Sequence, residues 1–126
     1  MDSKEFVDMI TEIILSKKGS DIKILDMKDV SSIADYFIIC SADSDTQVKA
    51  IADEVDRKLA KQGIKCYHKE GLVGLNWALL DYVDVVVHIF RTPSRAYYNL
   101  EKLWGDAPVI EVIDQLEQKS LDGEND

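Results

Sequence analysis

The sequence has few cysteines and no long apolar run. Cys40 and Cys66 are its only cysteines, too few and too far apart for a zinc framework, and each lies in a strand-like segment. We expect reduced thiols, buried or half-buried, and see no positional support for a nucleophile pair with His68 or His88. No segment approaches the roughly 20 apolar residues that a helix needs to span a bilayer. The N-terminal stretch MDSKEFVDMI is not typical of a signal peptide either, so the sequence predicts a cytoplasmic protein without membrane contact.

Positive charge is also in short supply. Fifteen basic residues face 24 acidic ones, the net charge is −9, and the longest basic cluster is only Lys17-Lys18. This balance repels phosphate backbones, so we expect no direct nucleic-acid binding. A nucleoprotein partner would be met more easily through one of its basic proteins. The acidity alternatively serves solubility alone.

What is present indicates one folded α/β domain. The 126 residues are 46% hydrophobic and 31% charged, a composition typical of a folded soluble protein. We assign residues 1–108 to the domain and 109–126 to a short element and an acidic tail. The short element, VIEVI, is an edge strand or a helical turn. The loop EGLVGL lacks the Lys-Ser/Thr and the following helix of a phosphate-binding loop, so no cofactor is expected.

Periodicity places the elements. It predicts a helix over residues 3–18, a strand near an edge in DIKILDM, a more central strand in ADYFIICSA and a third strand in IKCYHKE. Ser44 and Gln47 form a capping box that begins a second helix, and Gly63 ends that helix. Thr92 and Pro93 predict the start of a further helix over SRAYYNLEKLW. Strand, helix and strand around Ser44 favour a right-handed parallel crossover.

The stretch NWALLDYVDVVVHIF predicts a hairpin with two different faces. With a two-residue loop at Tyr82-Val83, directly opposed pairs share a face. The expected pairs are Asp81 with Asp84, Leu79 with Val86, and Trp77 with His88. One face is then wholly apolar and lies under the helices. The other is mixed, and it carries Trp77, Leu79, Asp81, Asp84, Val86, His88 and Phe90.

The mixed face suits a binding surface, because aromatic anchors with a polar rim concentrate interface energy. Alternatively, the first helix or the tail covers it and Trp77 is ordinary core. Asp81 and Asp84 admit another alternative, a nucleotidyltransferase-like enzyme in which both carboxylates hold Mg²⁺. Aspartates beside a hairpin turn have a simpler explanation in turn geometry, and a lone His88 is typical of a satisfied strand residue. We therefore predict no catalytic or metal-binding residue.

Three ordered blocks of the chain resemble the ribosomal silencing factor family, also called RsfS or Iojap. They are SSIADYFIICSADSDTQVKAIADEV, EGLVGLNWALLDYVDVVVHIF and SRAYYNLEKLWGDAP, and the resemblance runs from about Asp21 to Pro108. It implies a small α/β domain with a mixed sheet of about five strands, distantly similar to nucleotidyltransferase cores but not an enzyme. It further implies binding to ribosomal protein L-fourteen (uL-fourteen) of the large ribosomal subunit, a block of subunit joining, and less translation when nutrients are scarce.

The resemblance also maps a partner surface onto this chain. That surface covers Trp77 to Asp84 and extends to Glu70, His88 and, at the start of the last helix, Arg95. The chain departs from the family at the hairpin turn, where the common Tyr-Gly-Asp is Tyr82-Val83-Asp84. A β-branched valine resists positive φ, so a different turn would shift the pairing. A homodimer that pairs two Trp77 faces is a further alternative.

Overall fold

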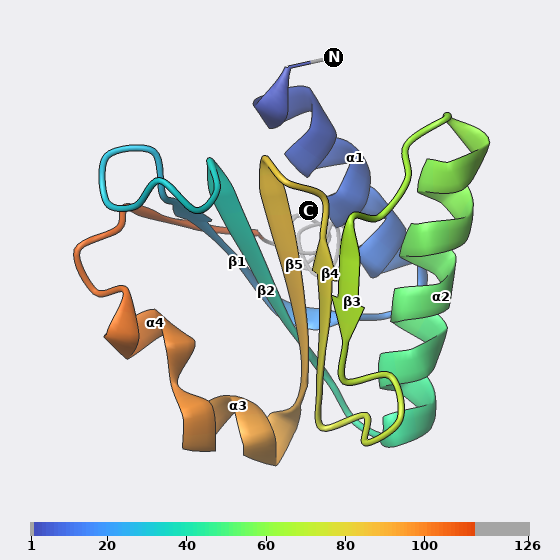
Figure 1. Cartoon of the computed structure of the whole chain (residues 1–126). Helices are drawn as coiled ribbons and strands as arrows, with labels where there is room; N and C mark the ends of the chain where they lie inside the picture. The colour runs from blue at the N-terminus through green and yellow to red at the C-terminus, as the bar shows by residue number, and fades with distance from the viewer. Residues whose placement is uncertain (1, 113–126) are drawn as a thin grey trace, which may run out of the picture.

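The computed structural model describes residues 2–112 and shows one α/β domain with a six-stranded sheet between two helical layers (Figure 1). The helices and strands follow the chain in the order α1 (Ser3–Ser16), β1 (Ser20–Asp26), β2 (Tyr36–Ala42), α2 (Asp45–Lys61), β3 (His68–Glu70), β4 (Trp77–Asp81), β5 (Val85–Arg91), α3 (Thr92–Tyr98), α4 (Leu100–Leu103) and β6 (Val109–Glu111). The acidic tail predicted for the end of the chain lies outside the described residues.

The sheet is mixed, with strand order β3-β4-β5-β2-β1-β6. Only the central pair, β2 with β5, is parallel; the other neighbours are antiparallel. The connection from β2 through α2 leads to β3 at the far edge, so β5 and β4 occupy the sheet between them. The sheet has one strand more than the expected five or so, because VIEVI supplies β6. That strand makes the edge, and β1, which we expected near an edge, is the second strand in.

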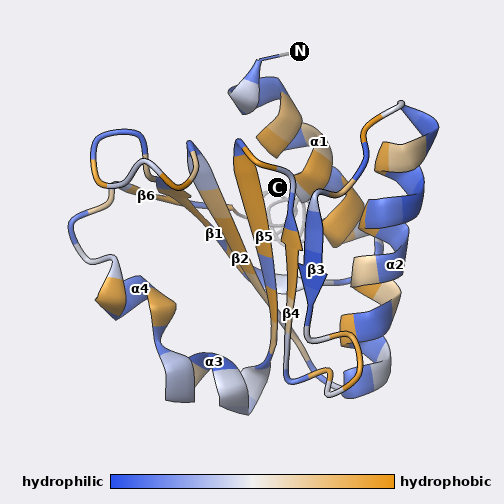
Figure 2. Cartoon of the chain, in the orientation of Figure 1, coloured by the Kyte–Doolittle hydropathy of each residue, from blue (hydrophilic) through white to orange (hydrophobic). Residues whose placement is uncertain are grey.

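The layer of α1 and α2 covers one face of the sheet. The interior-facing side chains of both helices meet the alternate residues of the strands in a continuous apolar cluster, as the hairpin pattern predicted for Ala78, Leu80, Val85, Val87 and Ile89. All five are at most 1% exposed. Colouring by hydropathy separates the buried and the exposed sides, since the central strands are largely apolar and the outward side of α2 is hydrophilic (Figure 2).

The predicted cap of α2 forms, with one difference. Ser44 Oγ accepts from the Gln47 amide at 3.1 Å. Gln47 Oε1 accepts from the Asp43 amide rather than from Ser44, and its Nε2 donates to the carbonyls of Lys17 and Lys18. One side chain thus joins the end of α1 to the beginning of α2.

The last predicted helix is wrong in two respects. It breaks at Asn99, which adopts a left-handed conformation with φ 47° and separates α3 from α4. The Asn99 side chain accepts from the Lys102 amide, so it caps the second piece. Thr92 is not the N-cap, because its hydroxyl donates to the Ala42 carbonyl on β2 instead. The short helices pack across the sheet face opposite α1 and α2 (Figure 1).

The hairpin register also differs from the expected one. Trp77 pairs with Phe90, Leu79 with His88, and Asp81 with Val86. The pairing is shifted by two residues, and a shift of two preserves the faces. Val83 adopts φ 74° at the turn, where the Asp84 amide donates to the Tyr82 carbonyl at 3.0 Å. The turn therefore keeps the backbone shape that favours glycine, with a valine in it.

Candidate functional site

The sheet face opposite α1 and α2 is covered over only part of its width. Near β2, β5 and β1, side chains from the strands pack beneath the α3 and α4 segment in a second cluster. Phe37 meets Trp104 edge to face, with ring centroids 5.9 Å apart. This covering segment is not the first helix that we weighed as an alternative, and the tail, the other alternative, lies outside the described residues. Within residues 2–112 the β3 and β4 edge of the face is left without a helix.

We call that edge the open face and define it by His68, Glu70, Trp77, Leu79 and Asp81. These five side chains share one side of the sheet, since His68 is opposite Asp81 and Glu70 is opposite Leu79. Trp77, Leu79 and Asp81 are half-buried, and the two β3 residues are exposed. Figure 2 shows β3 as a hydrophilic strand at the edge of the sheet, next to β4. The open face therefore combines an apolar centre with an acidic rim.

A hollow of about 310 Å³ lies at one end of the open face. It is lined by Glu70, Gly71, Gly74, Leu75, Asn76, Trp77, Leu79 and Tyr98. Gly71 has φ 78°, and a Cβ there would come within 1.9 Å of the Trp77 carbonyl oxygen. The loop between β3 and β4 thus packs on the backbone of β4 only because it has a glycine at this position.

Trp77 is held in place by an aromatic group rather than standing free. Its ring stacks on Phe90 with centroids 4.9 Å apart, and Tyr98 from α3 lies at the same distance on a tilted plane. Its indole Nε1 donates to His88 Nδ1 at 3.1 Å. The side chain is therefore preorganised, with part of its surface left in solvent.

His88 lies beneath this group and not on the surface. It is 3% exposed, and the cost of burying an imidazolium lowers its pKa to about 3. Because Nδ1 accepts from Trp77, the proton of the neutral ring is on Nε2. That atom has no hydrogen-bond partner among the described residues. The predicted contact residue thus orients Trp77 instead of reaching a partner in this conformation.

Arg95 is also buried, at 6% exposure. Its Nε donates to Glu101 at 2.9 Å, and its Nη1 donates to Ser41 Oγ at 2.8 Å and to the Asp21 carbonyl. These bonds tie α3 to β1, β2 and the α4 segment. The expected partner contact is therefore a clamp that fixes the covering segment.

Asp81 and Asp84 do not form a carboxylate pair. Asp81 is opposite Val86, and its Oδ1 accepts from the Val83 amide at 2.8 Å, which is turn chemistry. Asp84 lies exposed in the turn itself. Within residues 2–112 no group of three or more His, Cys, Asp or Glu side chains is arranged to hold a metal ion. The arrangement does not support the Mg²⁺ alternative.

The cysteines also match the sequence expectation. Both are free thiols; Cys40 is buried and Cys66 is half-buried. Burial raises the pKa of the Cys40 thiol to about 12, so it is not a nucleophile at neutral pH. Cys66 contacts the backbone carbonyls of His68 and Asp81 and makes no bond to an imidazole. Among the described helices, none is long and apolar enough to cross a membrane.

Sequence reasoning missed Leu75, Asn76 and Tyr98 as part of the site. Tyr98 is half-exposed against Trp77 because α3 crosses the sheet there. Nothing in the sequence indicated this, because the prediction was an unbroken helix and the break at Asn99 was not expected. Leu75 and Asn76 lie in the loop before β4, and only the fold of that loop brings them to the hollow.

Comparisons with known proteins agree with this arrangement. A family model described as "Ribosomal silencing factor during starvation" matches residues 1–126. A ribosomal silencing factor of Halalkalibacterium halodurans is 45% identical over 89% of this chain and 96% of its own length. A chloroplastic Iojap protein of Arabidopsis thaliana is 34% identical over 88% of this chain, which spans 46% of that protein.

A solved structure supports the fold as well. The crystal structure of a Chromobacterium violaceum protein matches with a TM-score of 0.81 and 37% identity, over 83% of this chain and 88% of that one. The three sequence blocks, the α/β fold and the full-length family match agree, and the chain belongs to the ribosomal silencing factor family, whose members regulate ribosomes without enzymatic chemistry.

Proposed function

We propose that the chain binds the large ribosomal subunit through ribosomal protein L-fourteen (uL-fourteen), using the open face, and so sterically prevents the small subunit from joining. Translation is repressed without any chemical step. The observation that carries this proposal is the half-buried apolar centre of the open face beside the carboxylates of Glu70 and Asp81. We place this activity in the cytoplasm, where the large subunit is found.

The energetics of such a contact follow from the geometry. Fully burying a Trp removes about 150 to 250 Å² from water, an upper limit of roughly 4 to 6 kcal/mol at 25 cal/mol per Å². Trp77 is already half-buried by Phe90 and Tyr98, so its contribution to binding is smaller than this limit. The exposed carboxylates of Glu70 and Asp84 complement a basic protein and speed the encounter in a salt-sensitive way.

The test is a sucrose-gradient profile of purified subunits mixed with an excess of the protein. We expect fewer joined ribosomes with the wild type and restored joining with Leu79→Lys, which places a cation at the centre of the open face. Ile110→Lys is the matched control, because Ile110 is 52% exposed on β6 at the opposite edge of the sheet. Joining that is unaffected by the wild type overturns the function. Equal effects of both variants overturn the site.

Self-association through the same face is a competing use of these residues. A homodimer pairing two open faces would hide them from the ribosome. Sedimentation velocity over a range of concentrations, with Leu79→Lys beside the wild type, distinguishes the two uses. A dimer that Leu79→Lys dissociates places the open face in self-association, and a monomer at all concentrations leaves it available for the ribosome.

A further inference from the structure

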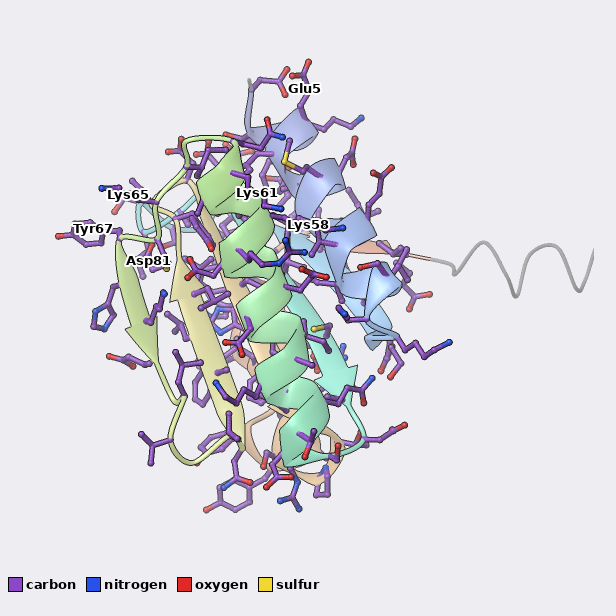
Figure 3. All side chains as sticks on the ribbon, turned by 90° about the vertical axis from the view of Figure 1, so that its right-hand side faces the viewer. Glu5, Lys58, Lys61, Lys65, Tyr67 and Asp81 are labelled. Atoms are coloured by element: carbon purple, nitrogen blue, oxygen red, sulfur yellow. The ribbon has the colours of Figure 1, made fainter. Side chains whose placement is uncertain are left out.

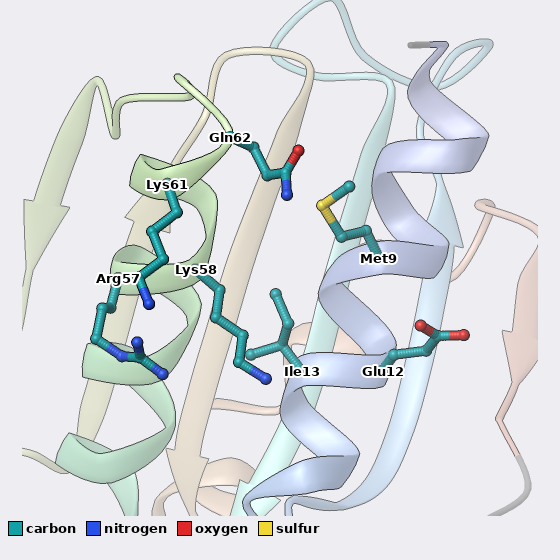
Figure 4. Close-up of a pocket in the computed structure, with 7 residues that line it drawn as sticks. All are labelled: Met9, Glu12, Ile13, Arg57, Lys58, Lys61 and Gln62. Carbon is teal, nitrogen blue, oxygen red and sulfur yellow. The ribbon is translucent and has the colours of Figure 1, made fainter.

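A second groove lies on the other side of the molecule, between α1 and α2. It encloses about 410 Å³ and is lined by Met9, Glu12, Ile13, Arg57, Lys58, Lys61 and Gln62 (Figure 4). The proposed function does not use it, because the whole sheet separates it from the open face. Its floor is apolar, formed by Met9 and Ile13 on α1.

The α2 side of this groove is basic in a chain whose net charge is −9. Lys58 extends from α2 toward α1, and Lys61 and Arg57 point along the same side of the groove (Figure 4). Arg57 is paired with Glu54, but neither Lys58 nor Lys61 forms a salt bridge among the described residues. Glu12 points away from α2 on the far side of α1 (Figure 4). Figure 3 shows Lys58 and Lys61 on the face where the two helices lie side by side.

The groove is thus complementary to a ligand that has apolar side chains and negative charge. Residues 113–126 of this chain, IDQLEQKSLDGEND, have both: three aliphatic residues, five acidic residues and one lysine. They carry four of the nine net negative charges. An external polyanion would first have to approach a protein of net charge −9, whereas a tethered segment is already present at high effective concentration.

The chain also leaves the described region on the correct side. Val112 follows β6, and its side chain packs against the apolar cluster beneath α1 and α2. From the β6 edge the tail must cross α1, which is about 10 to 12 Å wide with its side chains. Fourteen residues span up to roughly 46 Å when extended, so the groove is within reach. We infer that the acidic C-terminal segment, residues 113–126, docks in the basic groove between α1 and α2 of the same chain.

Paramagnetic relaxation in the full-length protein tests this inference. A nitroxide is attached at Ser120→Cys in a Cys66→Ser background; Cys40 is fully buried and does not react. We expect broadening of the Met9, Ile13 and Gln62 amide signals. It should fall about fivefold in Lys58→Glu/Lys61→Glu, because two surface ion pairs are lost, and it should weaken at high salt.

Two further variants make the result specific. Lys49→Glu/Lys102→Glu changes the net charge equally but lies outside the groove, so it should leave the broadening in place. Adding Asp122→Lys/Glu124→Lys to Lys58→Glu/Lys61→Glu should restore it by exchanging the charges. Broadening at another surface, or none above the level of free nitroxide, overturns the inference. Broadening that persists unchanged in Lys58→Glu/Lys61→Glu also overturns the inference.

Discussion

The two faces of the sheet are built by different means. On the face under α1 and α2, the space is filled mostly by aliphatic side chains from strands and helices, with Phe6, Tyr36 and Tyr82 among them, and no polar side chain of β4 or β5 takes part. On the opposite face, aromatic rings and the buried polar residues His88 and Arg95 hold a short helical segment that covers part of the width. An apolar face of this kind supplies stability, whereas a polar and aromatic one fixes the shape of a surface that is still partly in water.

Among the substitutions that test this difference, Arg95→Met should have the largest effect on stability. Removing the guanidinium leaves Glu101 and Ser41 Oγ without their partner under the covering segment. We expect a loss of about 3 to 5 kcal/mol in the free energy of unfolding, measured by urea denaturation. Lys102→Met is the control, as an exposed cation on α4 of the same layer. A loss no greater than that of the control would show that packing alone holds the segment.

Two neighbouring leucines on β4 compare the faces directly. Leu80 is 1% exposed under the helices, and Leu79 is half-buried on the open face. Leu80→Ala should lower the free energy of unfolding by about 2 to 5 kcal/mol, because it leaves a cavity. Leu79→Ala should cost clearly less, while only Leu79 variants weaken the block of subunit joining. Equal losses of stability for the two would remove the distinction between the faces.

The buried His88 predicts an acid sensitivity of the aromatic face. Its pKa is about 3 in the folded protein, below the ordinary value of about 6.5 that holds in the unfolded chain. The unfolded state therefore binds the proton first, and stability falls as the pH drops below 6.5. From pH 6.5 to 5 the loss is about 1.6 kcal/mol.

Urea denaturation at several pH values measures this slope. His88→Gln keeps an acceptor for Trp77 Nε1 but does not titrate, so its stability should be nearly flat over the same range. A wild-type protein as flat as the variant would mean that the folded state accommodates the imidazolium. A variant as steep as the wild type would assign the slope to other groups.

The smallest effect on stability is expected at the hairpin turn between β4 and β5. Val83 is a β-branched residue at φ 74°, and a conformation of this kind costs of order 1 to 3 kcal/mol. Val83→Gly relieves this cost but adds freedom to the unfolded chain. The net gain should be about 1 kcal/mol in thermal or urea unfolding. Val73→Gly, at a residue that is 98% exposed in a loop, should not stabilise the protein.

Local patterns were sufficient for α1, α2, the approximate positions of the strands and the two faces of the hairpin, but not for the last helix. Apolar periodicity located α1 and α2, and alternation assigned Leu80 to the core and Leu79 to the other side even though the register was off by two residues. A slip of two leaves every side chain on its own face. The faces were therefore predictable without the turn.

Burial of polar residues could not be predicted in the same way. The family resemblance mapped His88 and Arg95 onto the partner surface, and nothing local shows that the α3 and α4 segment packs on this face and buries both side chains. The break at Asn99 lets the segment bend over the sheet, and it depends on one left-handed residue that composition does not reveal. The surface proposed for the partner thus narrows from the whole mixed face to its β3 and β4 edge.

The pairing of β6 with β1 has a consequence for how the protein is made. Lys23, Ile24 and Leu25 find their second strand partner only in residues 109–111, and the central parallel pair joins β2 to β5, nearly fifty residues later in the sequence. The complete sheet therefore forms only after β6 has been synthesised, because the β2–β5 and β1–β6 pairings join segments that are far apart along the chain. The β6 edge is therefore the last part of the described sheet that can form as the chain is synthesised.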